Sequence, residues 1–132
     1  MKLKNLLAIT LGLIFLNSTS SKATDDAQTQ QLMTNPVARD KAMSNDPKAK
    51  QADAFIKNLT GNDPGLTEEA YSLAADVFAN IVKDCNGDIV KMKAAMEKFM
   101  KNPDQFAATW TEAQKTRLKD LEDKIHLNPA KN

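Results

Sequence analysis

All five prolines of this sequence follow asparagine or aspartate, and three of these pairs strongly constrain the fold as expected helix starts. These three are Asn35-Pro36, Asp46-Pro47 and Asn102-Pro103, while the other two lie in an expected turn over 62–65 and in the expected tail over 128–132. An asparagine or aspartate side chain can accept a hydrogen bond from a free N–H group at a helix start. Proline fits the first helical position because it has no N–H to lose there. The pairs therefore predict three helix starts in one short chain.

Apolar residues recur three and four positions apart after these starts, as on the buried face of a helix. Long alternation of apolar and polar residues is missing, so strands are not expected. We expect an all-α domain, a small irregular bundle of about four to five short helices. The helix from Pro47 is expected to bury Ala52, Phe55, Ile56 and Leu59, and the next, after a Thr67 cap, to bury Ala70, Leu73, Ala74, Val77, Phe78, Ile81, Val82 and Cys85. Between an Asp88 cap and about Lys101, the expected buried residues are Ile89, Met92, Met96, Phe99 and Met100, and a short piece over 103–108 adds Phe106. The last helix follows a capping box at Thr111–Gln114, ends near Leu127 and is expected to bury Leu118, Leu121 and Ile125.

The first 23 residues have the order of a secretory signal peptide. Lys2 and Lys4 come first, an uncharged apolar run of 11 residues follows over 6–16, and a small, polar stretch ends at Ala23. A transmembrane span needs about 20 apolar residues, so the run is too short to serve as an anchor. Cleavage is expected after Ala23, with 18–20 as a competing site.

Cleavage would leave a single domain of 109 residues. The expected organisation is a signal peptide over 1–23, a flexible polar arm over 24–34, a helical domain over 35–127 and a flexible tail over 128–132. Because the signal peptide contains three lysines and no acidic residue, the formal charge falls from +1 to −2. That balance gives no basic footprint for nucleic acid. The mature form would have no transmembrane segment and would lie in the periplasm or outside the cell.

Catalytic and metal-binding patterns are missing from the mature sequence. Its one cysteine, Cys85, and one histidine, His126, are too few for a standard structural zinc site. The loop over 84–88 looks faintly like a calcium loop, but the alignment puts Val82 and Lys93 at ligand positions. Met92, Met96 and Met100 could offer thioethers to Cu(I), although their spacing is typical of a core stripe. We expect no catalytic residue, no metal and no cofactor, and hence no enzyme.

Cys85 and His126 leave two interpretations open. Cys85 is either a small buried residue at the end of an apolar stripe, or a reactive thiol that bridges to another chain. His126 is expected in solvent near a helix C-terminus, where positive charge is tolerated. A catalytic pairing of the two is an alternative that the sequence leaves open.

Two short strings resemble the paired Leu-Thr-x-x-Gln motifs of small periplasmic stress chaperones. They are Leu66-Thr67-Glu68-Glu69-Ala70, which lacks the glutamine, and Trp110-Thr111-Glu112-Ala113-Gln114, which lacks the leucine. The match covers about ten residues. The resemblance implies a helical, cradle-shaped dimer that holds unfolded clients without ATP.

Export, small size and charged helical faces together favour a binding protein. The leading hypothesis is an exported non-enzymatic interaction protein, such as a secreted bacterial effector, virulence factor or inhibitor-like factor. Its candidate binding residues are Lys91, Lys98 and Lys101, expected on the outer side of the helix over 88–101. They would meet an acidic patch on a protein partner or an anionic lipid headgroup, while the alternative is a solvated face that keeps the protein soluble. The alternative function is an ATP-independent periplasmic chaperone.

Overall fold

The computed structural model describes residues 3–16, 34–44 and 47–127. Within these ranges it is all-helical, as predicted, and contains no strand. All but the last residue of the expected arm over 24–34, the Asp46 cap and the tail over 128–132 lie outside these ranges. The helices are α1 (Leu3–Leu16), α3 (Pro36–Met43), α4 (Pro47–Leu59), α5 (Pro64–Asp84), α6 (Ile89–Lys101), α7 (Pro103–Ala108) and α8 (Glu112–Leu127).

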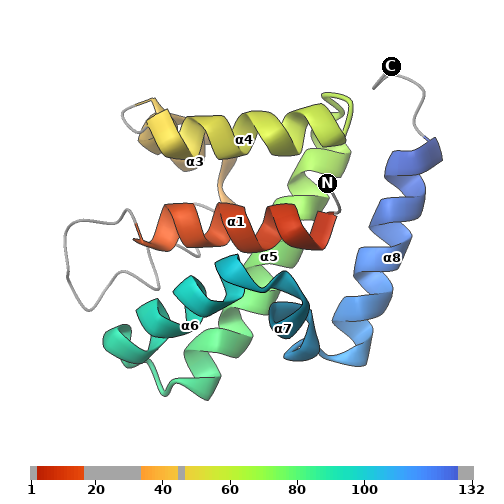
Figure 1. Ribbon diagram of the computed structural model, residues 1–132. Helices are drawn as coiled ribbons and strands as arrows, with labels where there is room; N and C mark the ends of the chain where they lie inside the picture. The colour runs from red at the N-terminus through yellow and green to blue at the C-terminus, as the bar shows by residue number, and fades with distance from the viewer. Residues whose placement is uncertain (1–2, 17–33, 45–46, 128–132) are drawn as a thin grey trace.

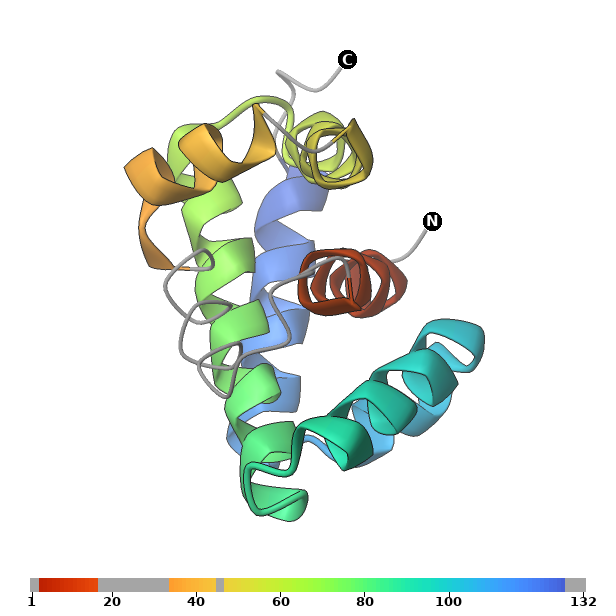
Figure 2. The same ribbon diagram turned by 90° about the vertical axis from the view of Figure 1, so that its left-hand side faces the viewer.

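The helices form two layers. The long helix α5 and the C-terminal helix α8 run antiparallel, side by side, and form the rear layer (Figures 1 and 2). In front of them α4, α1 and α6 are stacked, with α1 between the other two. The short helix α7 leads from the end of α6 to the start of α8. From α3 onward the described chain forms an irregular bundle of six helices, slightly more than the four to five expected, and two of them, α3 and α7, are only 8 and 6 residues long.

Short polar side chains cap several of the helix starts, but the predicted cap at Asn102 is wrong, because its side chain makes no cap hydrogen bond at the start of α7. Asn35 accepts hydrogen bonds from the N–H groups of Val37 and Ala38, and Asp88 does the same for the first turn of α6. Thr111 and Gln114 form the predicted capping box, in which each side chain binds the backbone N–H of the other. These starts were visible in the sequence because each depends on residues within one turn.

The predicted start of α5 at Thr67 is wrong. The helix begins at Pro64, and Asp63 is the cap that accepts a hydrogen bond from the Leu66 N–H. Proline in the first turn fits because that position has no intrahelical partner for an N–H. Thr67 instead lies inside the helix, buried, with its hydroxyl 2.8 Å from that of Thr60. The first chaperone-like string is therefore internal to α5 and does not begin a helix.

The core follows the predicted stripes closely. The expected residues of α5 are buried from Ala70 to Ile81, with Val82 and Cys85 partly buried against them. Phe106 joins the core from α7, with its ring centroid 5.3 Å from that of Phe99 and 5.4 Å from that of Trp110. Met92 and Met96 are fully buried, in agreement with their interpretation as core residues.

The predicted burial of Phe55 is wrong. Its side chain is 47% exposed, and the buried positions of α4 are Ala52, Asp53 and Ile56. Asp53 faces inward because the hydroxyl of Tyr71 donates a hydrogen bond to it. This contact joins residues 18 positions apart, so the spacing of apolar residues within α4 could not show it.

Helix α1 lies within the core, although its sequence is that of the predicted signal peptide. Leu3, Leu6, Leu7, Ala8 and Leu11 are buried, and the helix contacts α4, α5, α6, α7 and α8. No helix in the described ranges is long and apolar enough to cross a membrane. Cleavage after Ala23 stays a prediction, and it would remove this helix from the bundle.

Candidate functional site

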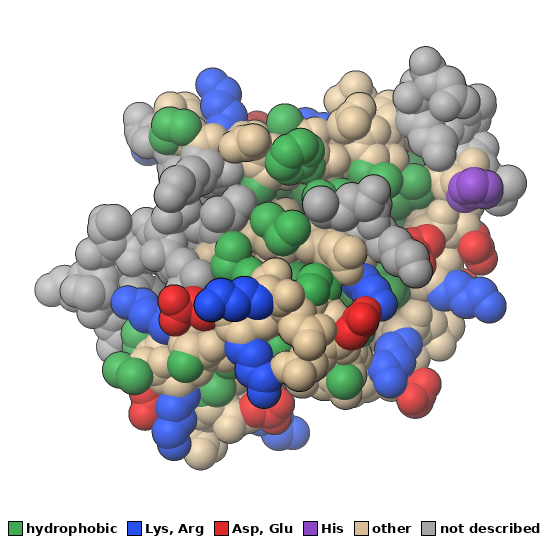
Figure 3. All heavy atoms as spheres, viewed as in Figure 1, with side chains coloured by type: hydrophobic (Ala, Val, Ile, Leu, Met, Phe, Trp, Pro, Cys, Tyr) green, Lys and Arg blue, Asp and Glu red, His purple; other side chains and the backbone are tan. Residues whose placement is uncertain are grey.

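The candidate lysines share one side of α6. Lys91, Lys98 and Lys101 are exposed, and a helix of 100° per residue places them within about a quarter of its circumference. At about 1.5 Å per residue they span about 15 Å along the helix. We call these three residues the α6 lysine face. Basic side chains gather over α6 on the surface seen in Figure 3.

The lysines of the α6 lysine face have no ion pair to a described residue, as is also true of the exposed Lys41, Lys50 and Lys119 on three other helices. Six ion pairs join the described helices or adjacent turns, and their basic partners are Lys4, Arg39, Lys57, Lys115, Arg117 and Lys124. No lysine of α6 takes part in an ion pair with another described residue. The helix itself contains a single acidic residue, the exposed Glu97. The lysine face therefore carries positive charge that the described fold leaves for solvent or a partner.

The opposite side of α6 holds the lysine face in place. Met92 and Met96 are completely buried, Phe99 is nearly so, and Ile89 packs partly buried against the core. Asp88 fixes the start of the helix through two backbone N–H groups. The helix therefore cannot rotate about its axis without exposing its apolar side, and the lysines keep a fixed outward direction.

A second charged cluster ties α3, α4 and α5 together. Arg39 is buried, pairs with Glu68, and stacks over the ring of Tyr71 with 3.7 Å between the guanidinium carbon and the ring centroid. The Tyr71 hydroxyl donates to Asp53 at 2.5 Å, and the other oxygen of Asp53 lies 2.9 Å from the Lys57 ammonium. Burial and this hydrogen bond raise the pKa of Tyr71 well above its usual value. The hydrogen bond to Asp53 also raises the pKa of Lys57.

A shallow cavity of about 300 Å³ lies beside this cluster, lined in part by Arg39, Lys57 and Glu68. Because these charges already pair with each other or with Asp53, their arrangement holds three helices together rather than presenting a free acid or base. Sequence reasoning missed this cluster. Arg39 and Asp53 lie on helices whose amphipathic pattern gives no reason to bury a charge.

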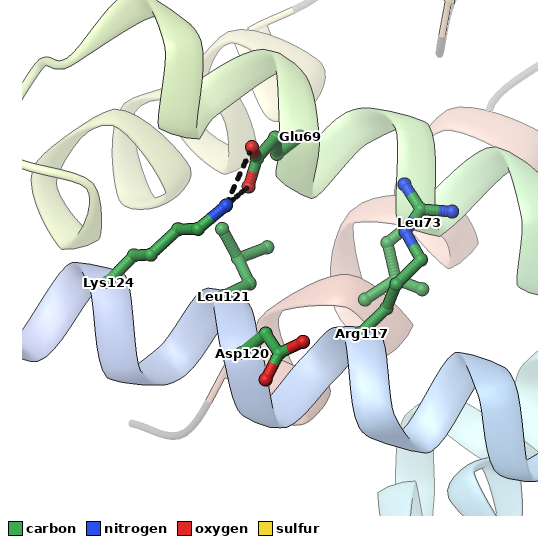
Figure 4. Close-up of a pocket in the computed structure, with 6 residues that line it drawn as sticks. All are labelled: Glu69, Leu73, Arg117, Asp120, Leu121 and Lys124. Atoms are coloured by element: carbon green, nitrogen blue, oxygen red, sulfur yellow. Dashed lines mark hydrogen bonds and ion pairs between the residues drawn. The ribbon is translucent and has the colours of Figure 1, made fainter.

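A smaller cavity of about 200 Å³ lies between α5 and α8. Figure 4 shows Glu69 and Lys124 meeting across it, with Leu73 and Leu121 at its base. The ammonium of Lys124 is 3.1 Å from Glu69 Oε1. Farther along the same pair of helices Arg117 pairs with Asp76. The Asn80 side-chain amide donates to Gln114 Oε1 at 2.7 Å.

These contacts form a row along the antiparallel helices, and the cavity lies between two of them, the Glu69–Lys124 pair and the Asp76–Arg117 pair. The polar positions 69, 72, 76 and 80 recur at helical spacing beside the buried stripe of α5. That recurrence is a signal from which the sequence analysis could have inferred a partner helix.

Cys85 and His126 lie at opposite ends of the bundle. Cys85 is the residue after α5, His126 lies in the last turn of α8, and these helices run antiparallel (Figure 1). The alternative of a Cys85–His126 catalytic pair is therefore wrong. Cys85 is half-buried, and burial followed by the neighbouring Asp84 carboxylate raises the pKa of its thiol. No cluster of three or more metal-ligating side chains occurs in the described parts of the chain.

The surroundings of α1 form an apolar channel. We use the name α1 seat for the surfaces of α4, α6 and α7 that contact α1. The buried apolar residues of these three helices are Ala52, Ile56, Met92, Met96, Phe99 and Phe106, and the side chain of Met100 lies against Gly12 of α1. A Cβ atom added to Gly12 of α1 would lie 2.1 Å from the sulfur of Met100. At the other end of α1, the ammonium of Lys4 lies 2.6 Å from Asp104 Oδ1.

Comparison with known proteins identifies no relative. No family model matches the chain, and no match was found among the curated proteins or the solved structures. The short resemblance to periplasmic chaperones is therefore not extended by any longer similarity.

Proposed function

We propose that this chain is an exported, non-enzymatic binding protein that recognises an acidic patch on a protein partner through the α6 lysine face. The observation that carries the proposal is the grouping of unpaired charge: three outward lysines without an ion pair among the described residues lie together on one side of a fixed helix, whereas the exposed Lys41, Lys50 and Lys119, also without such a pair, lie on three separate helices. Processing after Ala23 and a final place in the periplasm or medium are part of this proposal.

A protein partner fits these lysines better than a lipid surface does. Adsorption to anionic membranes is favoured by larger basic clusters joined to an apolar helical face. Here α6 offers only three outward lysines, its apolar side is used by the core, and Val90 is its one exposed large apolar residue. The processed chain also carries a net charge of −2, so attraction to an acidic surface is local and acts over a Debye length of about 8 Å at physiological salt.

Charge reversal on α6 tests this function. The test variant replaces Lys91, Lys98 and Lys101 with glutamate, and the matched control reverses Lys41, Lys50 and Lys119, which are exposed on other helices without an ion pair to a described residue. Both variants change the net charge equally. Tagged, exported protein is used for affinity capture from periplasm, medium and host lysate, and then for binding assays with the captured partner.

We expect the α6 variant to bind the captured partner at least about tenfold more weakly, mainly through slower association. The control variant should bind this partner with unchanged affinity. Circular dichroism should be the same for both variants. Equal binding of both variants to every captured partner would eliminate the α6 lysine face. Selective loss of binding to vesicles of anionic phospholipid, without loss of a protein partner, would replace the protein by a lipid headgroup.

The second candidate function is an ATP-independent chaperone, and the α1 seat favours it. Three methionines line one side of this seat, and methionine is an adaptable side chain that suits surfaces for varied apolar segments. The candidate requires that the seat be free in the working protein, which removal of α1 would achieve. Suppression of client aggregation by the exported protein, with little preference among clients, is the result that distinguishes it from recognition of one acidic partner.

A further inference from the structure

Export processing would change the interior of this protein and not only its N-terminus. Residues 1–23 include the whole of α1, whose Leu3, Leu6, Leu7 and Leu11 belong to the buried core, and this helix contacts five others. Without α1, the apolar residues of the α1 seat lose the surface that covers them. We expect these residues to be covered again, because large contiguous patches of exposed apolar surface are rare in monomeric proteins.

We infer that the α1 seat of the processed protein binds an apolar helix of another exported protein, in the place that α1 occupies in the unprocessed chain. This inference rests on the processing step of the proposed function and is independent of the α6 lysine face. Helix α1 itself shows what the seat accepts: 14 residues in helical form, with leucines at 3, 7 and 11 in successive turns.

Two contacts define the helix that fits. Gly12 lies against Met100, where even a Cβ atom would force the methionine to move. Lys4 pairs with the exposed carboxylate of Asp104, near the first turn of α7. A fitting helix therefore has a basic residue near its N-terminus, an apolar face of three or more turns, and a small residue about eight positions after the basic one.

Helix α1 is an imperfect occupant of its own seat. The hydroxyl of Thr10 is buried and has no hydrogen-bond partner among the described residues. Burial of a polar group without a partner weakens an association, so a helix with an apolar residue at this position should bind more tightly. This property favours exchange of α1 for another helix over permanent retention.

Peptide binding to the processed protein tests the inference. The protein is purified from the exported fraction, and the probe is a fluorescent peptide of residues 3–16 with a short lysine tail for solubility, followed by fluorescence anisotropy. We expect saturable 1:1 binding, at least about tenfold weaker binding of a Gly12→Phe peptide, and several-fold tighter binding of a Thr10→Val peptide. These ratios correspond to free-energy differences of about 1.4 kcal/mol per factor of ten.

A charge exchange locates the peptide in the seat. Asp104 is 81% exposed, so Asp104→Lys should leave the fold intact. Compared with the unchanged protein, this variant should bind the Lys4 peptide several-fold more weakly. Its affinity for a Lys4→Glu peptide should equal the affinity of the unchanged protein for the Lys4 peptide. Exposed Val90 supplies the control, since Val90→Lys adds a charge on the outer side of α6 and should leave both peptides unaffected.

Four results would overturn the inference. They are absence of saturable binding, equal binding of the Gly12→Phe peptide, a stable dimer of the processed chain that covers the seat, and a co-purified lipid that the peptide cannot displace. An exported chain that still begins at Met1 would overturn it as well, because α1 then fills the seat, and this last result alone would also contradict the proposed function.

Discussion

At the scale of single residues, the polar interior was the hardest part to predict. Arg39, Asp53 and Tyr71 come from three helices and meet only in the folded chain. Each is a charged or polar residue on a helix whose apolar spacing accounts for the core without it. By contrast, the caps at Asn35 and Asp88 and the Thr111–Gln114 capping box were correctly predicted, because their chemistry is local.

Titration of Tyr71 tests this interior cluster. The chain has a single tyrosine, so tyrosinate absorbance in the ultraviolet reports Tyr71 alone. Burial and the hydrogen bond to Asp53 raise its pKa, so the native protein should ionise well above the value of about 10 that is expected after denaturation. Ionisation near pH 10 in the native protein would show that the cluster does not form.

The same pKa shifts give the sign of the pH dependence. Tyr71 and Lys57 both have pKa values raised by folding. Their contribution to stability is complete below about pH 10 and is lost as pH rises through the raised pKa values. At neutral pH, Tyr71→Phe should lower the free energy of unfolding by about 1.5–3 kcal/mol, the range for a hydrogen bond to a charged group. The stability of this variant should also fall less steeply as the pH rises above about 10.

At the scale of helices, the spacing of apolar residues predicted most of the buried faces. It failed where contacts with a neighbouring helix determine which residues are buried. Most expected residues of the stripes of α5, α6 and α8 are buried, while Val82, Cys85, Ile89, Met100 and Leu118 are only partly buried. The start of α5 and the burial of Phe55 were wrong, since the first depends on the competing Asp63-Pro64 cap and the second on the Tyr71–Asp53 hydrogen bond. The sequence also gave no sign that α1 lies between α4 and α6, because its apolar residues surround the helix without a clear face.

Truncation of Met92 tests the orientation of α6. Met92→Ala should lower the free energy of unfolding of the full-length chain by about 2–5 kcal/mol, because the side chain is fully buried. The control is Val90→Ala on the same helix, which is 76% exposed and should change stability by no more than about 0.5 kcal/mol. Denaturant unfolding of protein made by cell-free translation without membranes provides the measurement. Equal effects of the two substitutions would mean that the lysine face is not held outward as described.

At the scale of the whole molecule, the all-α class was predictable, and the place of the first helix was not. Helical spacing and caps are encoded within short windows, whereas the packing of α1 depends on apolar surfaces contributed by helices far along the chain. The candidate lysines lie where the sequence put them, exposed on one side of α6. Their partner is not encoded in any local pattern, because charge complementarity involves a second molecule.

The proposed function and the inferred role of the α1 seat both require that α1 is removed during the proposed export. Intact mass and N-terminal sequencing of protein recovered from the periplasm or the medium measure this step. The expected product begins within a few residues of Thr24 and has lost Leu3–Leu16. A soluble exported chain that still begins at Met1 would contradict both proposals, because α1 would then be a permanent core helix and neither a signal peptide nor an open seat would exist.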